Sequence, residues 1–149
     1  MQFSQNGWQA SANRGAIGIK NYIIPGTNRN MTCAQAVAPI FMAFLAEFHA
    51  KIEKIDVGTF DDYGYATPKL IPGSDVYSNH SSGTACDINS SVHPWHRRTY
   101  KPFKKRKIRL LAKKYALRWG GNYKNSVDEM HFEVVQSPEQ VKERIIKMQ

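Results

Sequence analysis

A histidine and an aspartate frame the stretch Ser78–Asn89, which reads S-N-H-S-S-G-T-A-C-D-I-N. His80 stands seven residues before Asp87, and the residues between them are small and include a glycine. Imidazole and carboxylate groups are both good ligands for a borderline divalent ion such as zinc. The segment Ser81–Gly83 can turn the chain between two short extended pieces. We therefore expect His80 and Asp87 to converge on one ion.

A third ligand is expected because catalytic zinc sites have three protein ligands and leave one position to water. The segment Asp128–Val134, D-E-M-H-F-E-V, offers one. In a strand, His131 and Glu133 share one face, and the apolar residues beside them face the core. Asp128 can reach a water at the ion without being a ligand. Spacing alone allows Glu129 or Glu133 in the same acid-base role.

The two segments together resemble a known family. The pattern S-x-H-x-x-G-x-A-x-D, followed by D-x-M-H-F-E, is similar to zinc D-Ala-D-Ala carboxypeptidases and phage L-alanyl-D-glutamate endopeptidases (endolysins). These VanY-type metallopeptidases are related in their metal site to lysostaphin and the hedgehog signalling domain. Trp119–Tyr123, W-G-G-N-Y, resembles the approach to the second motif in that family. Weaker resemblances to a phage and actinobacterial branch lie at Asn6–Trp8, Ile24–Thr27 and Phe48–His49.

The resemblance implies a ligand set and a mechanism. It makes His80, Asp87 and His131 the ligands of one Zn²⁺ ion and Asp128 the general base. Zinc lowers the pKa of a bound water to about 7. Asp128 would take the proton of that water and later deliver it to the departing amine.

Amide hydrolysis also needs a positive charge to stabilise the oxyanion that develops on the attacked carbonyl group. Which residue supplies that charge is less well defined. The family usually carries an arginine before the first motif, and here Lys69 stands at that place, nine residues before Ser78. Lysine keeps the charge but lacks the planar two-pronged donor. Either Lys69 acts as a point charge, or Arg29 or another arginine takes its role. We expect Ser78 to bind substrate or brace the turn, and Glu133 to orient a ligand or help hold substrate.

Length and composition bound the class of protein. With 149 residues, 42% of them hydrophobic, we expect one catalytic domain over residues 1–149. No apolar run is long enough to span a membrane, and the polar N-terminus lacks a signal-peptide pattern. For an enzyme that cuts the cell wall, this favours a phage enzyme that leaves the host cytoplasm and reaches the bacterial cell wall during lysis. If the sequence is a trimmed piece, the enzyme could instead be secreted.

The net charge of +9 favours polyanionic partners in general. The basic run Lys104–Lys107 is interpreted as a solvated helix face, with attraction to the wall or to nucleic acid as the second choice. Nucleic-acid binding would depend steeply on salt but would leave both metal motifs unexplained, so peptidoglycan is the expected partner. Cys33 and Cys86 are too few for a disulfide framework. Cys86 should be a buried thiol, although a bridge to Cys33 stays open.

Apolar periodicity predicts three helices. The first runs from Val37 to Ile52, with Pro39 in its first turn, and His49 on it is expected to be structural or solvated. The second, basic helix is expected over Pro102–Arg118, with Phe103 on its apolar face. The third begins at the capping signature Ser137–Gln140. Its expected buried stripe consists of Val141, Ile145, Ile146 and Met148.

The remaining segments are expected to form short strands and loops. His93 and His96 invite a second metal site, but Pro94 lies between them, so we expect a loop at the rim of the cleft. Trp95 can contact a sugar or peptide there. Beyond the two motifs, strands are expected near Ile19–Ile24, Val57–Phe60 and Tyr63–Ala66.

These patterns predict an α+β fold in which a small, mostly antiparallel sheet carries the metal ligands and about three helices pack against it. The expected function is a zinc peptidase that hydrolyses an amide bond in peptidoglycan stem peptides, as a phage endolysin endopeptidase and as a monomer. A D-Ala-D-Ala carboxypeptidase is the alternative within the class. A non-enzymatic, metal-containing wall-binding module is the alternative outside it, and the presence of Asp128 argues against that module.

Overall fold

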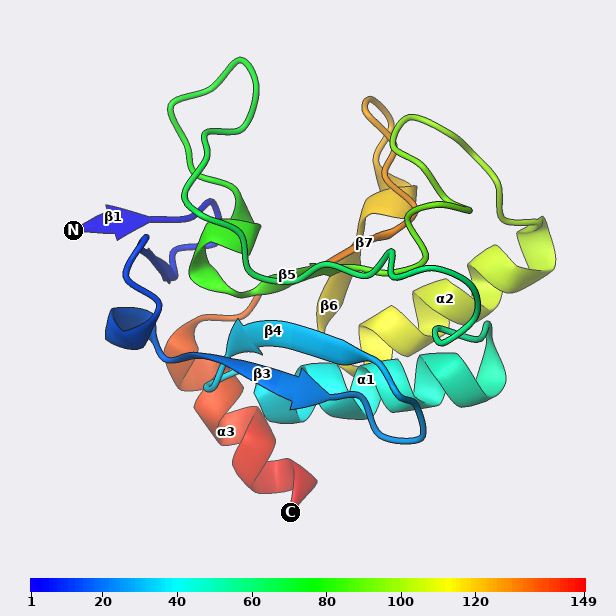
Figure 1. The fold of residues 1–149 in the computed structure, drawn as a ribbon, viewed down its shortest axis with the longest axis horizontal. Coiled ribbons are helices and arrows are strands. Elements are labelled where there is room, and N and C mark those ends of the chain that lie inside the picture. Colours follow the sequence, from blue (N-terminus) through cyan, green and yellow to red (C-terminus); the bar gives the residue numbers. More distant parts are fainter.

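The computed structural model describes all 149 residues and shows the expected α+β fold, with three α-helices and three small antiparallel sheets (Figure 1). The predicted single sheet is therefore divided into separate pieces. The strands are β1 (Gln2–Phe3), β2 (Gln9–Ala10), β3 (Ile19–Ile23), β4 (Asn30–Ala34), β5 (Ala85–Asp87), β6 (Leu117–Trp119) and β7 (His131–Val134). The α-helices are α1 (Ala38–Lys51), α2 (Pro102–Lys114) and α3 (Pro138–Met148), and short 3₁₀ helices cover Gly15–Ile17 (η1), Asn79–Ser82 (η2) and Gly120–Asn122 (η3).

The three-stranded sheet, in the order β5-β7-β6, carries the second half of both motifs. Its register sets His131 opposite Asp87, and sets Glu133 opposite Ala85 on one side and Arg118 on the other. Since directly opposed residues point to the same face of a sheet, the side chains of Asp87, His131, Glu133 and Arg118 share one face. The other face is apolar and belongs to the core.

The apolar face of this sheet packs on α1. Phe132 of β7 lies 4.7 Å from Phe44 and 5.9 Å from Phe48 between ring centroids, and all three side chains are fully buried. They belong to one hydrophobic cluster of 25 residues, in which Trp119 of β6 also takes part. Burying such aromatic side chains is the main source of stability in a domain of this size. The packing of this cluster fixes the position of the three-stranded sheet, and of its polar face, relative to α1.

Long loops rise from the polar side of the sheet, while the helices gather on the other side (Figure 1). The loop of residues 67–77 stands at one end of the polar face. The loops of residues 90–100 and 123–128 stand at the other end. The hairpin of β3 and β4 contacts β5 through β4, and its residues Met31, Cys33 and Ala34 belong to the same hydrophobic cluster as α1. The strand predicted near Ile19–Ile24 is thus confirmed as β3.

The predicted helices are present, with corrections at their ends. The helix α1 matches the expected range, and the capping box of Ser137 and Gln140 is formed at the start of α3. The basic helix α2 ends at Lys114 and not at Arg118, because Ala116 takes a left-handed conformation with φ of 53° and the chain turns into β6. Phe103 was expected on the apolar face of α2 but is 70% exposed.

The buried stripe predicted for α3 is only half correct. Val141 is buried and Ile145 packs against the core, but Ile146 is 63% exposed and Met148 is 43% exposed. The last turns of α3 project beyond the body of the molecule, where the chain end lies (Figure 1). Few neighbours are there to cover these two side chains.

The strands predicted at Val57–Phe60 and Tyr63–Ala66 are wrong as strands. Residues 57–60 form bends with exposed side chains, and only Tyr63 forms an isolated bridge, to Asp87. The segment instead wraps around Arg29, whose guanidinium donates to the Gly58 carbonyl and stacks on the Phe60 ring. Residues 63–65 make only isolated backbone hydrogen bonds to Asp87 of β5 and Thr32 of β4, which are too few to form a ladder.

Two smaller expectations concern side chains in the core. Cys33 and Cys86 are both buried and free, so the open possibility of a bridge is not realised. His49 is structural, because its Nδ1 accepts a hydrogen bond from the backbone N–H of Ile55, in the segment that follows α1. No helix has the length and apolar character needed to cross a bilayer.

Candidate metal centre

His80 is positioned by a short helix. We expected it on an extended piece, but it lies in η2, where the Ser78 side chain accepts a hydrogen bond from the His80 backbone N–H. Ser78 therefore braces the turn, which was one of its two expected roles. The turn ends at Gly83, which has a left-handed φ of 69°. A Cβ atom at Gly83 would lie 2.6 Å from the Ala34 backbone nitrogen, so only glycine fits.

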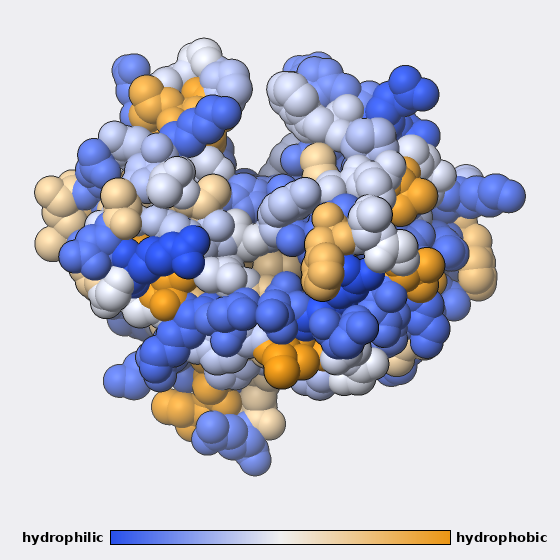
Figure 2. Space-filling view, viewed as in Figure 1, coloured by the Kyte–Doolittle hydropathy of each residue, from blue (hydrophilic) through white to orange (hydrophobic).

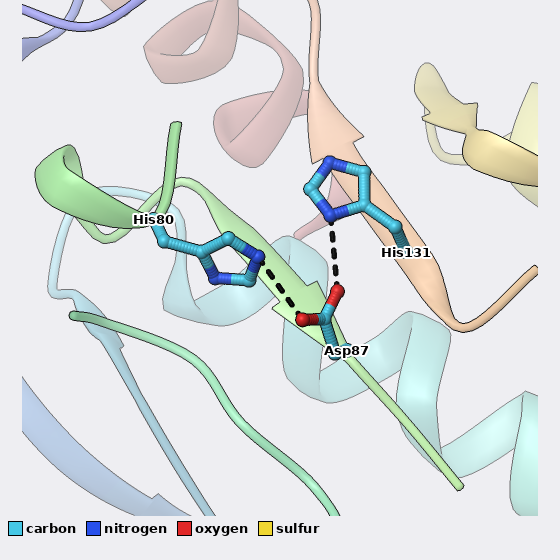
Figure 3. A group of neighbouring side chains, drawn as sticks. All are labelled: His80, Asp87 and His131. Atoms are coloured by element: carbon cyan, nitrogen blue, oxygen red, sulfur yellow. Dashed lines mark hydrogen bonds and ion pairs between the residues drawn. The ribbon is translucent and has the colours of Figure 1, made fainter. Parts of the chain in front are cut away.

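The three predicted ligands come together from different elements. His80 comes from η2, Asp87 from β5 and His131 from β7, and the Asp87 carboxylate lies between the two imidazoles (Figure 3). His80 Nε2 is 3.2 Å from Asp87 Oδ2, and His131 Nδ1 is 3.0 Å from Asp87 Oδ1. One ligand atom from each residue lies within 4.8 Å of the other two.

These separations fit a tetrahedral metal ion. Ligand atoms at about 2.0–2.1 Å from zinc lie about 3.3 Å apart along a tetrahedral edge. Two imidazole nitrogens and one carboxylate oxygen are also a donor set that zinc accepts. The residues present therefore fit a zinc ion with one coordination position left open.

Both imidazoles are oriented by acceptors behind them. His80 Nδ1 lies 2.7 Å from the carbonyl oxygen of Gly64, and because a carbonyl only accepts, Nδ1 carries the proton. His131 Nε2 lies 3.0 Å from Glu133 Oε1 and donates to that carboxylate. Each ring then presents its other nitrogen to Asp87. Such outer partners set the tautomer that a metal ligand needs.

Glu133 is itself held by three donors. Its Oε1 accepts from the Tyr123 hydroxyl at 2.5 Å as well as from His131, and its Oε2 accepts from the Asn79 side chain. Asn79 Oδ1 in turn accepts from the backbone N–H of Asn6 at 2.9 Å. The N-terminal segment, which carries only a weak resemblance, thus supports the side chain that orients His131.

The electrostatics follow from the packing of acids against imidazoles. Burial alone would raise the pKa of Asp87, but hydrogen bonds from His131 and His80 hold the pKa well below its usual range. Burial opposes protonation of His131, yet the hydrogen bonds to Asp87 and Glu133 outweigh burial and raise its pKa to about 10. Two carboxylates flank this imidazole, so the site attracts a positive charge. A divalent cation bound there would supply that charge and displace the proton.

Asp128 lies beside this group on a tightly packed backbone. Its backbone N–H donates to the Gly120 carbonyl at 3.0 Å, and a Cβ atom at Gly120 would lie only 2.2 Å from the Asp128 carbonyl oxygen. The glycine at position 120 in the W-G-G motif therefore lets the Asp128 segment pack closely against the backbone of that motif. Asp128 Oδ1 is buried without a hydrogen-bond partner. Burial raises the pKa of the Asp128 carboxyl to about 6, while nearby His131 acts in the opposite direction.

The other two acids that spacing left open are engaged elsewhere. Glu129 is fully buried and points to the far side, where its Oε1 accepts from the backbone of Thr99 and Tyr100. Glu133 is occupied by the donors described above. Among the three carboxylates, Asp128 is the one that lines the same hollow as His131 and keeps a buried oxygen free.

The ligands lie between two hollows. One, of about 300 Å³, is lined by Tyr63, Lys69, His80 and Asp87, among others. The other, of about 410 Å³, includes Trp95, Asp128 and His131. Ser78 lines both. In the space-filling view a notch separates the loop of residues 67–77 from the loops of residues 90–100 and 123–128 (Figure 2).

The candidate cations differ in position. Lys69 is exposed and lines the hollow beside His80, where its charge can reach a substrate. Arg29 is 5% exposed, is bonded to Gly58 and lines neither hollow, so it is not available as a substitute. His93 is buried with both ring nitrogens hydrogen-bonded, and Trp95 stands at the rim as expected.

Four residues around the site were given no role from the sequence. Asn79 and Tyr123 hold Glu133, the Gly64 carbonyl orients His80, and Arg118 lines the hollow beside Asp128. Tyr123 and Asn79 stood within or beside the quoted motifs, so proximity to a ligand was the available signal. Nothing local marks Gly64, because its contact with His80 joins loops that meet only in the folded chain.

The comparisons with known proteins agree with this geometry. Residues 72–134 match the family described as D-alanyl-D-alanine carboxypeptidase. No curated protein and no solved structure matches the chain. The matched segment contains Ser78, His80, Asp87, Asp128 and His131 but not Lys69. The resemblance to this peptidase family is therefore confirmed over residues 72–134.

Proposed function

We propose that residues 1–149 form one catalytic domain, a zinc-dependent peptidase that hydrolyses an amide bond in peptidoglycan stem peptides. The observation that carries this proposal is the convergence of His80, Asp87 and His131 within 4.8 Å, inside a segment that matches a peptidase family. The orientation of both imidazoles by Gly64 and Glu133 supports it, because such support is typical of metal ligands.

His80, Asp87 and His131 would hold the ion, and Asp128 would be the acid-base group. A bound zinc ion supplies Lewis acidity and lowers the pKa of a water to about 7. Asp128, whose Oδ1 has no protein partner, takes the proton of the attacking water and gives it to the departing amine. Lys69 brings positive charge to the neighbouring wall of the cleft, where it stabilises the developing oxyanion.

The open cleft favours cleavage within a peptide. Hollows extend on both sides of the ligand group, so a substrate chain can continue past the scissile bond in both directions. We therefore propose an endopeptidase, acting at L-Ala–D-Glu or a similar bond, in the role of a phage endolysin. Removal of a terminal D-Ala is the alternative, because the matched family is described as a D-alanyl-D-alanine carboxypeptidase.

Digestion of purified peptidoglycan tests the proposal. The metal-loaded chain should release new amino groups, and identification of the new N-termini assigns the bond. New D-Glu termini support the endopeptidase, and free D-Ala supports the carboxypeptidase. Wall that binds the chain but stays uncut over long incubation would contradict both, and would favour a non-enzymatic wall-binding module.

A further inference from the structure

Arg118 lies on the polar face of the three-stranded sheet and has no bonded partner there. It lies on β6 directly opposite Glu133, so its side chain rises from the same face as His131 and Asp87. The residue is exposed, and its guanidinium makes no hydrogen bond and no ion pair within 4.0 Å. A guanidinium has five N–H donors in a planar fork, and all five are free here.

Glu133 does not account for the arginine. Both oxygens of this carboxylate are already taken by Tyr123, His131 and Asn79. Arg118 acts on it only at longer range, as one of the charges that lower the pKa of Glu133 against the effect of burial. If the role of Arg118 were to neutralise the buried Glu133 carboxylate, its guanidinium should contact that carboxylate, and it does not.

The position of Arg118 in the cleft suggests a ligand. It is the sole lysine or arginine lining the hollow that contains Asp128 and His131, and Lys69 lines the other hollow. The same hollow presents neutral polar groups from Ser78 and Ser126 and an aromatic wall from Trp95. A planar anion next to the reacting amide matches this lining, because arginine binds carboxylates with two parallel hydrogen bonds.

We propose that Arg118 binds a carboxylate of the substrate beside the scissile amide, on the Asp128 side of the cleft. The inference rests on the proposed peptidase function and adds a specificity determinant to it. Stem peptides offer this chemistry in two places, the α-carboxylate of D-Glu and the C-terminal carboxylate of D-Ala. Both are carboxylates close to a bond that the enzyme can cut, and amidation removes the charge of either.

Matched synthetic stem peptides test the subsite. One pair differs only in a free or amidated D-Glu α-carboxylate, and a second pair differs only in a free or amidated C-terminus. The wild type should lose about 10- to 100-fold in kcat/KM when the recognised carboxylate is amidated, as expected for a charge-assisted hydrogen bond. The pair that shows the loss identifies which carboxylate is bound. Equal rates within both pairs would overturn the proposal.

Variants of Arg118 separate recognition from general damage. Arg118→Gln should lower kcat/KM for the acid peptide by about 10- to 100-fold and leave the amidated peptide unchanged, so that the preference disappears. Arg118→Lys should keep part of the preference, because the charge remains without the fork. Arg106→Gln on α2 is the matched control, since it removes the same charge outside both hollows. Equal losses on both peptides in Arg118→Gln would overturn the proposal.

Binding measured without turnover distinguishes a failure of the Arg118 proposal from a failure of the proposed peptidase function. In the Asp128→Ala variant, calorimetric titration with the acid and the amidated peptide reports affinity alone. Tighter binding of the acid, abolished by adding Arg118→Gln, supports the subsite even if no bond is cut, in which case the proposed function fails by itself. Cleavage by the wild type combined with equal affinities for acid and amide would leave the function standing and overturn the subsite.

Discussion

Two groups of side chains in this protein combine histidine with a carboxylate but differ in what their atoms face. In the group of His80, Asp87 and His131, two imidazole rings each turn one nitrogen toward the same carboxylate (Figure 3). In the other group, His93 Nε2 lies 2.8 Å from Glu53 Oε1 and its Nδ1 contacts the Thr99 hydroxyl. In the first group three side chains of ligand type meet within 4.8 Å. The second, which we call the closed group, has a single imidazole whose two nitrogens are both hydrogen-bonded to neighbouring side chains.

The closed group has a mechanical role. Glu53 also accepts hydrogen bonds from the Tyr100 hydroxyl and the Asn89 side chain, and the His93 ring stacks on Tyr100 at 3.7 Å. These contacts tie the segment after α1 to the loop of residues 90–100, whose Trp95 stands at the cleft. A histidine near a carboxylate therefore indicates a metal site only when one of its ring nitrogens lies close to the ligand atoms of at least two other side chains.

Removing a ligand should produce the largest effect. His80→Ala or His131→Ala should weaken zinc binding by more than about 100-fold, since loss of a supporting residue alone costs 10- to 100-fold, and should lower the melting temperature of the metal-loaded chain. Metal analysis after dialysis and thermal unfolding measure both. His93→Ala is the matched control and should keep one zinc per chain. Full zinc occupancy in either ligand variant would break the distinction between the two groups.

Removing the acid-base group should act on rate alone. Asp128→Ala should reduce the rate of wall digestion by about 100- to 10,000-fold while zinc content stays near that of the wild type. Gly120→Ala should also slow digestion, because a Cβ atom there would lie 2.2 Å from the Asp128 carbonyl oxygen and displace it. Unchanged digestion by Asp128→Ala would remove this residue from the mechanism.

Opening the closed group should lower stability without changing metal content. His93→Ala leaves the Glu53 carboxylate without its imidazole partner, at an expected cost of about 2 kcal/mol in the free energy of unfolding. Urea unfolding measures the change, with zinc content as the second readout. Loss of zinc in a folded His93→Ala chain would mean that the second group also belongs to the metal site.

The half-buried Glu47 carboxylate and its partner Lys114 give the smallest expected effect. Hydrogen bonds from Lys114 and Tyr115 lower the pKa of Glu47 on α1 to about 2 from 4.5. Its contribution is therefore present above about pH 4.5 and is lost as the pH falls toward 2. Glu47→Gln should lower the free energy of unfolding at neutral pH by at most about 1 kcal/mol. The gap to the wild type, measured by urea unfolding, should shrink in acid, and a gap independent of pH would contradict this assignment.

The sequence was informative where a local pattern carries the structure. The apolar periodicity of α1, the capping box at Ser137 and the alternation around His131 are all set by nearest neighbours, and all are found. The family pattern also named His80, Asp87 and His131, which converge in the fold. These features need no knowledge of distant contacts.

The errors lie where tertiary contacts decide. Val57–Phe60 has apolar residues like a strand, but Arg29 gathers the segment and no neighbouring strand pairs with it. The end of α2 and the exposed residues of α3 depend on what packs beside them. The Gly64 carbonyl and the unpaired guanidinium of Arg118 belong to the same class, because their surroundings come from remote parts of the chain.

The most direct test of the metal centre is a crystal structure of the zinc-loaded chain with anomalous diffraction at the zinc edge. We predict one strong peak about 2.0–2.2 Å from His80 Nε2, an Asp87 carboxylate oxygen and His131 Nδ1, with the fourth position facing Asp128. A peak held instead by His93 and Glu53, or no peak between the three predicted ligands at saturating zinc, would contradict it.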